Sequence, residues 1–233
     1  MKARLAMAGA AGALLAASVG SMSIALADDG PHSISANIGA VSNYVWRGQT
    51  QTDDQPAIQG GLDYAHESGF SLGTWVSNVD FASGANYELD VYAGYDFDLG
   101  DDISLGVSTI YYAYPDDDFD IDFWEIGIAG GYKWFTLGIQ YTVWNGDDND
   151  DFAFEEGDIY YYGGAEFELP YGLGLGLRLG YYDFETAEDP TNWGVSISKE
   201  AGDFGTFSLN YDQLDGDGYD EDPKFWVGWL KEF

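Results

Sequence analysis

The stretch YELDVYAGYDFD, residues 87–98, alternates strictly between apolar and polar or small side chains. One face carries Tyr, Leu, Val, Ala, Tyr and Phe, and the opposite face includes the carboxylates of Glu88, Asp90, Asp96 and Asp98. A period of two is that of a β-strand. Unpartnered carboxylates are too costly for the dry core of a β-sandwich, but they suit a wet lumen wall whose other face contacts lipid. The stretch therefore predicts a transmembrane β-strand.

The same alternation recurs along the chain and predicts an all-β fold, a transmembrane antiparallel β-barrel of about twelve strands. The predicted strands span residues 33–47, 55–65, 70–81, 87–98, 103–114, 121–132, 134–144, 159–169, 173–183, 192–199, 204–213 and 223–233. Most are close to the roughly 9–11 residues that a tilted transmembrane strand needs. An even number of strands is typical of a closed bacterial barrel.

The connections between these strands are of two alternating kinds. One set is short, as at 66–69 and 200–203, and the other is mostly longer and acidic, as at 145–158 and 214–222. Outer-membrane barrels have short periplasmic turns and longer extracellular loops. We therefore expect both termini to face the periplasm and the acidic loops to face outward.

The first 27 residues have the layout of a secretory signal peptide. Lys2 and Arg4 precede an apolar stretch that ends in the small-residue sequence Ala25-Leu26-Ala27. We expect residues 1–27 to be removed and residues 28–233 to form a single barrel domain.

Composition narrows the function classes. The chain carries 41 acidic and 8 basic residues, a formal charge of −33, and no cysteine. Nucleic acid is a poor partner because phosphate binding needs a basic face. Disulfides cannot stabilise the fold, and aromatic residues at 17% of the chain argue against disorder.

The inward face of the predicted barrel is the first candidate for function. Its predicted charged lining residues are Arg47, Asp63, Glu88, Asp90, Asp96, Glu125, Glu166, Arg178 and Asp212. Acid outnumbers base among them, so an open water path would prefer cations. The alternative is that these charges pair across a narrow lumen and fill it, because a twelve-strand barrel lies between the filled and the open types. Both interpretations remain open at this stage.

The C-terminal sequence FWVGWLKEF, residues 225–233, predicts an apolar, lipid-facing last strand that ends in an aromatic residue. Such an ending is typical of the signal by which outer-membrane barrels are recognised for assembly. Its predicted outward residues are Phe225, Val227, Trp229 and Phe233, with Lys231 interrupting the pattern.

Metal binding and catalysis have weak support. Loop 145–158 matches several positions of a calcium loop but holds Asp150 where the turn requires glycine, so we predict no metal site and no cofactor. The histidines, His32 and His66, both fall at the predicted periplasmic end, away from the outer rim where barrel enzymes place a histidine base. We therefore predict that the protein is not an enzyme.

Residues 43–81, NYVWRGQTQTDDQPAIQGGLDYAHESGFSLGTWVSNVDF, carry a more specific pattern than alternation alone. The passage resembles the signature of the TorF family of proteobacterial porins. The principal matching residues are Trp46, Arg47, Gly48, Pro56, Gln59, Gly60, Gly61, Trp75 and Asn78. The resemblance implies an outer-membrane β-barrel of porin type and supplies no catalytic residues.

Together these features predict an outer-membrane porin for small hydrophilic solutes or ions, with a mild preference for cations. The alternative is a closed barrel that acts through its acidic loops as a receptor, an adhesin or an envelope-stabilising protein. Expected partners are outer-membrane lipid and lipopolysaccharide, the barrel-assembly machinery and the solute itself, with a homo-oligomer as a further possibility.

Overall fold

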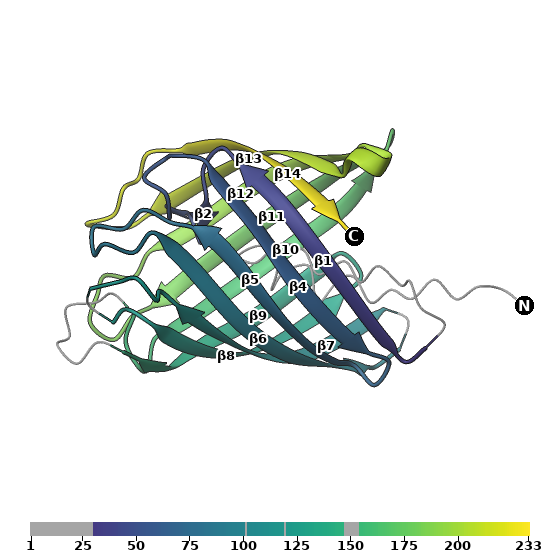
Figure 1. Cartoon of the computed structure of the whole chain (residues 1–233), viewed down its shortest axis with the longest axis horizontal. Coiled ribbons are helices and arrows are strands. Elements are labelled where there is room, and N and C mark those ends of the chain that lie inside the picture. Colours follow the sequence, from purple (N-terminus) through teal and green to yellow (C-terminus); the bar gives the residue numbers. More distant parts are fainter. Residues whose placement is uncertain (1–29, 101, 119, 147–153) are drawn as a thin grey trace, which may run out of the picture.

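The computed structural model describes residues 30–100, 102–118, 120–146 and 154–233, which form a closed β-barrel (Figure 1). The predicted signal peptide and the middle of the 145–158 loop lie outside the described residues. The wall strands are β1 (His32–Val41), β4 (Ala57–His66), β5 (Phe70–Asn78), β6 (Tyr87–Asp98), β7 (Ile103–Ala113), β8 (Phe123–Tyr132), β9 (Phe135–Asn145), β10 (Ile159–Leu169), β11 (Leu173–Asp183), β12 (Thr191–Glu200), β13 (Thr206–Asp215) and β14 (Lys224–Glu232).

Each wall strand pairs antiparallel with its neighbours, and β1 closes the barrel by pairing with both β4 and β14. The closing register places Ala40 opposite Trp229, and the Phe233 N–H donates to the Ala36 carbonyl at 2.8 Å. Closure leaves no free strand edge, as a membrane-spanning sheet requires. The predicted fold class, an antiparallel barrel of about twelve strands, is confirmed.

The two ends of the barrel differ as expected. At the end that we call the turn end, the connections are the short segments 67–69, 99–102, 133–134, 170–172 and 201–205, the last containing the 3-10 helix η1 (Gly202–Phe204). At the opposite loop end they are the segments 42–56, 79–86, 114–122, 146–158, 184–190 and 216–223. The N-terminal end of β1 and the C-terminus both lie at the turn end (Figure 1).

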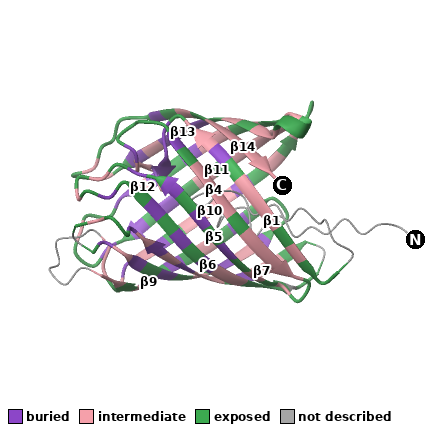
Figure 2. Ribbon diagram, in the orientation of Figure 1, coloured by how far each residue is buried: buried purple, intermediate pink, exposed green. Residues whose placement is uncertain are grey.

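Burial alternates along the strands (Figure 2), and many large apolar side chains are exposed. Ile34 on β1 is 76% exposed, and Leu137 on β9 and Leu209 on β13 are also exposed. An apolar belt of this extent around a closed barrel is a lipid-facing surface. No helix among the described residues is long and apolar enough to cross a membrane.

The last strand, β14, follows the predicted parity. Phe225 and Val227 face outward and are exposed, and Phe233 follows the strand with its ring 5.8 Å from the Lys231 ammonium. The indole N–H of Trp229 donates to the Phe204 carbonyl at 2.7 Å. The role of this strand in assembly stays a prediction.

The first predicted strand, 33–47, is too long. β1 ends at Val41, and the chain then turns into the lumen, where β2 (Val45–Trp46) and β3 (Gln49–Thr50) form a small separate hairpin. Tyr44 and Trp46 continue the even-numbered apolar series by coincidence. Their side chains are buried inside the barrel, unlike the lipid-facing positions that the series predicts.

Candidate lumen site and its internal loop

Loop 1, which we define as residues 42–56, folds inward as the β2–β3 hairpin. Arg47 and Gly48 form its two-residue turn, with φ of 48° and 87°. Two consecutive positive φ values are typical of the type I′ hairpin turn. A Cβ at position 48 would lie 2.9 Å from the Asn192 Cβ. Glycine is therefore required both by the turn and by the close approach to the wall.

Arg47 reaches across the lumen from the tip of this hairpin. Its two terminal nitrogens donate to the Glu125 oxygens of β8 at 2.8 and 2.7 Å, a bidentate pair, and it also donates to the Tyr182 hydroxyl of β11. The guanidinium carbon lies 4.2 Å from the Trp46 ring centroid and 4.1 Å from that of Tyr160. The Arg47 and Glu125 side chains are only 6% and 1% exposed. Loop 1 is thus anchored to two separate parts of the wall.

Aromatic side chains pack around the hairpin and fill the lumen at this level. Trp46 contacts Tyr112 and Phe123 with ring centroids 5.7 and 6.2 Å apart, and Tyr112 stacks on Phe123 at 4.3 Å. On another side, Tyr44 packs edge-on against Trp75 at 5.4 Å. The cluster is continuous from β5 to β11. It makes the loop-end half of the barrel a packed core.

Two carboxyl groups of β6 lie within this core, below loop 1. The Glu88 oxygens accept hydrogen bonds from the hydroxyls of Tyr44 at 3.1 Å and Tyr114 at 3.2 Å. Asp90, two residues further along the same face, is 0% exposed, and neither of its oxygens has a hydrogen-bond partner.

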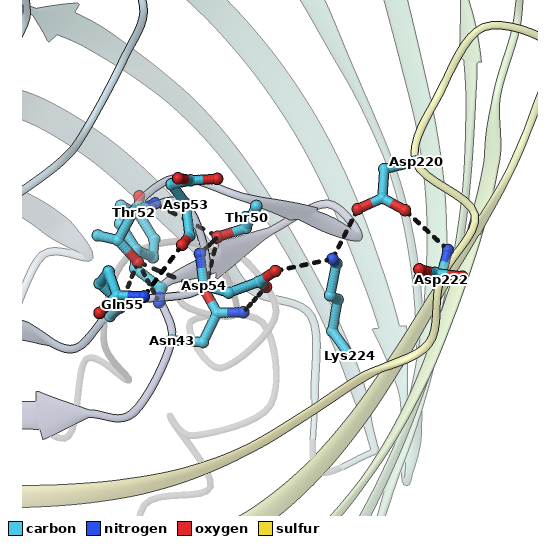
Figure 3. Close-up of polar contacts among 10 residues, drawn as sticks. Asn43, Thr50, Thr52, Asp53, Asp54, Gln55, Asp220, Asp222 and Lys224 are labelled. Carbon is cyan, nitrogen blue, oxygen red and sulfur yellow. Dashed lines mark hydrogen bonds and ion pairs between the residues drawn. The ribbon is translucent and has the colours of Figure 1, made fainter.

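At the rim, loop 1 is held by a second ion pair (Figure 3). The Lys224 ammonium lies 3.2 Å from an Asp54 oxygen and 2.7 Å from an Asp220 oxygen, so it joins loop 1 to the 216–223 loop. Asp54 also accepts from the Asn43 amide at 2.7 Å. The hydrogen bond from Lys224 lowers the pKa of Asp220, which keeps that partner ionised. Loop 1 is fastened at its tip and at its base.

The turn-end half of the lumen is wetter. The inward-facing side chains of Asp96 and Glu166 are exposed, whereas the Arg178 side chain is 24% exposed and pairs with Asp212 at 3.0 Å. Asp63 is half-buried and accepts from the Tyr92 hydroxyl at 2.6 Å. Acid predominates on this part of the wall.

The predicted lining residues therefore have different surroundings. Arg47 is not on the wall, as the sequence pattern suggested, but on the internal hairpin, because the chain leaves the wall after Val41. Glu88, Asp90, Glu125 and Asp212 face inward but are buried, so they are not exposed lining. The other predicted residues lie on the inward faces of their strands and are exposed or half-buried: Asp63, Asp96, Glu166 and Arg178.

The motif residues within 43–81 lie in loop 1 and on the strands next to it. Asn78 accepts from the Ile58 N–H at 2.8 Å and donates to the Pro56 carbonyl at 3.2 Å, which joins β4 to β5 at the base of the loop. The Gln59 amide donates to the Ser77 hydroxyl at 3.3 Å. A Cβ atom at Gly60 or Gly61 would lie 2.8 or 2.7 Å from a carbonyl oxygen of a neighbouring strand. The motif residues therefore join β4 to β5 at the base of loop 1.

Sequence reasoning missed several partners of loop 1. Tyr44 falls within the strand predicted at 33–47, and Asp54 lies outside every predicted strand. Tyr182, the hydrogen-bond partner of Arg47, lies 135 residues away along the chain. The sequence signal for the end of the wall strand is the polar pair Ser42–Asn43, which interrupts the alternation.

Comparison with known families gives a match over most of the chain. Residues 25–222 match the model of Gcw_chp, described as a bacterial protein of unknown function. The chain belongs to this family. No curated protein matches the sequence.

Solved structures with a similar fold are outer-membrane channels. The KdgM porin superimposes with a TM-score of 0.60 at 11% identity, covering 85% of this chain and 99% of that one. KdgM porin in complex with disordered oligogalacturonate gives 0.58 at 10% identity, covering 86% and 98%. An outer-membrane channel from Pseudomonas putida F1 gives 0.51 at 14% identity, covering 89% and 97%. The chain thus has the fold of outer-membrane porins, in agreement with the predicted outer-membrane location. The TorF name is not confirmed.

Proposed function

We propose that the protein is a porin-type channel of the outer membrane that passes small hydrophilic solutes or ions. The observation that carries the proposal is the water-exposed, mostly acidic inner wall at the turn end of a closed, lipid-facing barrel. Exposed carboxylates on an inner wall suit a water-filled path better than a lumen filled by paired side chains. The motif around loop 1, which resembles that of the TorF porins, supports the same assignment.

Cations are the favoured solutes. Asp96, Glu166 and Glu168 are exposed on the inward face, whereas Arg178 is engaged by Asp212. A ring of carboxylates raises the local concentration of cations and repels anions. KdgM has been solved with oligogalacturonate, an acidic oligosaccharide. The acidic wall of this barrel is poorly suited to such a solute.

Loop 1 sets the width of the path. The hairpin and its aromatic neighbours occupy the loop-end half of the lumen, so the narrowest part of the path lies beside Arg47 and Glu125. Solutes therefore pass either beside the hairpin or through the lumen after the hairpin has been displaced. No covalent chemistry is required.

Ion selectivity tests this proposal. The refolded protein, residues 28–233, is inserted into a planar bilayer under a potassium chloride gradient. We expect discrete conductance steps and a reversal potential that favours potassium. The double variant Glu166→Gln/Glu168→Gln reduces this preference, and the control Glu188→Gln, in an outer loop, leaves it unchanged. A folded protein that prefers chloride contradicts the cation assignment.

A second candidate function is favoured by one observation, the packed loop-end half of the lumen. A closed barrel would act through its acidic outer loops as a receptor, an adhesin or an envelope-stabilising protein. Complete absence of conductance by the wild type and by loop 1 variants would favour this role. We further propose lipopolysaccharide as the neighbour of these loops and the barrel-assembly machinery as the partner of β14.

A further inference from the structure

Glu88 and Asp90 form a buried pair of carboxyl groups on the inner face of β6. Their exposed fractions are 2% and 0%. They lie two residues apart in a strand, so both side chains point into the same region below loop 1. Trp75 and Tyr112 are the register partners of Asp90 on the flanking strands, and both are buried.

The two groups differ in how they are satisfied. Glu88 accepts one hydrogen bond at each oxygen, from Tyr44 and from Tyr114. Asp90 accepts none, and both of its oxygens are fully buried. Buried carboxylate oxygens without a donor are rare and costly in folded proteins. Asp90 is therefore satisfied either by a proton shared with the neighbouring Glu88 carboxyl or by a bound cation.

Among the described basic side chains, Lys133, Lys199 and Lys231 lie at the turn end, and the others are already paired. The Arg47 guanidinium is paired with both oxygens of Glu125, and Lys224 is held at the rim by Asp54 and Asp220. The remaining described arginine, Arg178, pairs with Asp212. Two ionised carboxylates would leave two negative charges in a water-poor core.

We propose that Glu88 and Asp90 bind one divalent hard cation, such as Ca²⁺, beneath loop 1. A single divalent ion balances both charges. The available donors are all oxygens, from two carboxylates with the phenols of Tyr44 and Tyr114 beside them, and Ca²⁺ prefers such ligands. Among the described residues no three acidic or histidine side chains form a metal centre, so any further ligands would be water molecules that enter the core with the ion.

This site is separate from the acidic outer loops. It lies inside the barrel, and its ligands join β6 to Tyr44 of loop 1 and to Tyr114 at the end of β7. Binding therefore stabilises the inward position of loop 1. The inference does not depend on whether the barrel conducts.

Terbium luminescence provides the test, with Tb³⁺ as the probe for Ca²⁺. Tyr44, Tyr114 and Trp75 lie next to the site and sensitise a bound Tb³⁺ ion. For the refolded barrel we expect saturable sensitised emission from one ion per chain, reversed by Ca²⁺. Asp90→Asn weakens this binding at least tenfold, and Glu88→Gln weakens it similarly. The outer-loop control Asp217→Asn retains it.

Thermal unfolding with Ca²⁺ and with a chelator provides a second readout. We expect Ca²⁺ to raise the melting temperature of the wild type and of Asp217→Asn, but not that of Asp90→Asn. Variants are compared only when heat-modifiable gel mobility shows a folded barrel, and Glu88→Gln serves if Asp90→Asn does not fold. Equal Tb³⁺ binding by wild type and both site variants overturns the proposal, as does the absence of saturable binding. Either result would mean that the pair is neutralised by protons.

Discussion

Arg47 connects the internal loop to the wall through a buried ion pair. Removing Arg47 and Glu125 from water is costly, and the cost is offset only when geometry is good and other contacts are made. Here the pair is bidentate, and the guanidinium also lies against the rings of Trp46 and Tyr160. Arginine is suited to this position because its planar guanidinium group can form two hydrogen bonds to a carboxylate and also stack on aromatic rings.

Replacing Arg47 by methionine is therefore expected to destabilise the barrel by about 3–5 kcal/mol, since Glu125 would be left buried and unpaired. The matched change Arg178→Met removes a partly exposed pair and should cost about 1 kcal/mol or less. Urea unfolding in lipid vesicles measures both. The double variant Arg47→Met/Glu125→Leu should recover much of the loss. Equal effects of Arg47→Met and Arg178→Met would contradict the anchoring role.

Asp158 gives the outer loops a pH dependence. Its oxygens accept from the backbone N–H groups of Glu155 at 2.7 Å and Glu185 at 2.8 Å, joining the 146–158 and 184–190 loops. Burial raises the pKa of Asp158 to about 6, and these hydrogen bonds offset only part of the rise. Because the folded pKa lies above the unfolded value, the stabilising contribution is complete below about pH 4 and is lost as pH rises through 6.

Lowering the pH from 7.5 to 4.5 should therefore stabilise the wild type relative to Asp158→Asn, which cannot take up this proton. The measurement is the difference between their melting temperatures at each pH. Comparing the two proteins cancels the titration of the many other carboxylates. A difference that does not change with pH would show that Asp158 titrates as an ordinary exposed acid.

At the scale of elements, alternation predicted strands well where both faces have a clear chemical identity. β6 was predicted with its observed bounds, because lipid selects one face and the lumen the other. The error at 33–47 arose because Tyr44 and Trp46 are apolar for a different reason, namely packing inside the barrel. Alternation records which side chains avoid water, and it does not distinguish lipid from an aromatic core.

The turn of the β2–β3 hairpin depends on Gly48. Gly48→Ala combines a positive φ with a close contact to the wall at Asn192. The expected cost is about 1–3 kcal/mol, and the loosened hairpin should give noisier and larger currents in a planar bilayer. Gly218→Ala is the matched control, since it has a similar φ of 89° but open space around it. Unchanged currents in Gly48→Ala would show that the conformation of this turn does not affect the conducting path.

The last strand, β14, is predicted to carry the assembly signal. Phe233→Ala removes its exposed terminal aromatic without disturbing a lumen contact. We expect a several-fold lower amount of heat-modifiable barrel in the outer membrane, with refolding in detergent unchanged. Phe207→Ala, an exposed lipid-facing residue of β13, is the control. Similar losses in both variants would assign the effect to lipid contact.

For the whole molecule, the sequence predicted the barrel and which strand positions face its lumen, but not how the residues of the site are arranged. The inward positions of Glu125 and Tyr182 follow from alternation, yet their meeting at Arg47 depends on a hairpin that crosses the lumen. Such contacts span 78 and 135 residues and leave no local pattern. The packed loop-end half agrees with the filled lumen, whereas an open, charge-lined path at the turn end stays a prediction.

If the barrel is a channel narrowed by loop 1, its unitary conductance must depend on that loop. Wild type is compared in planar bilayers with a variant in which residues 43–55 are replaced by a short Gly-Ser linker, both verified as folded by heat-modifiable mobility. We expect discrete steps for the wild type and a larger unitary conductance for the variant, with cation preference retained. Equal conductance in the two proteins, or none in either, would contradict it.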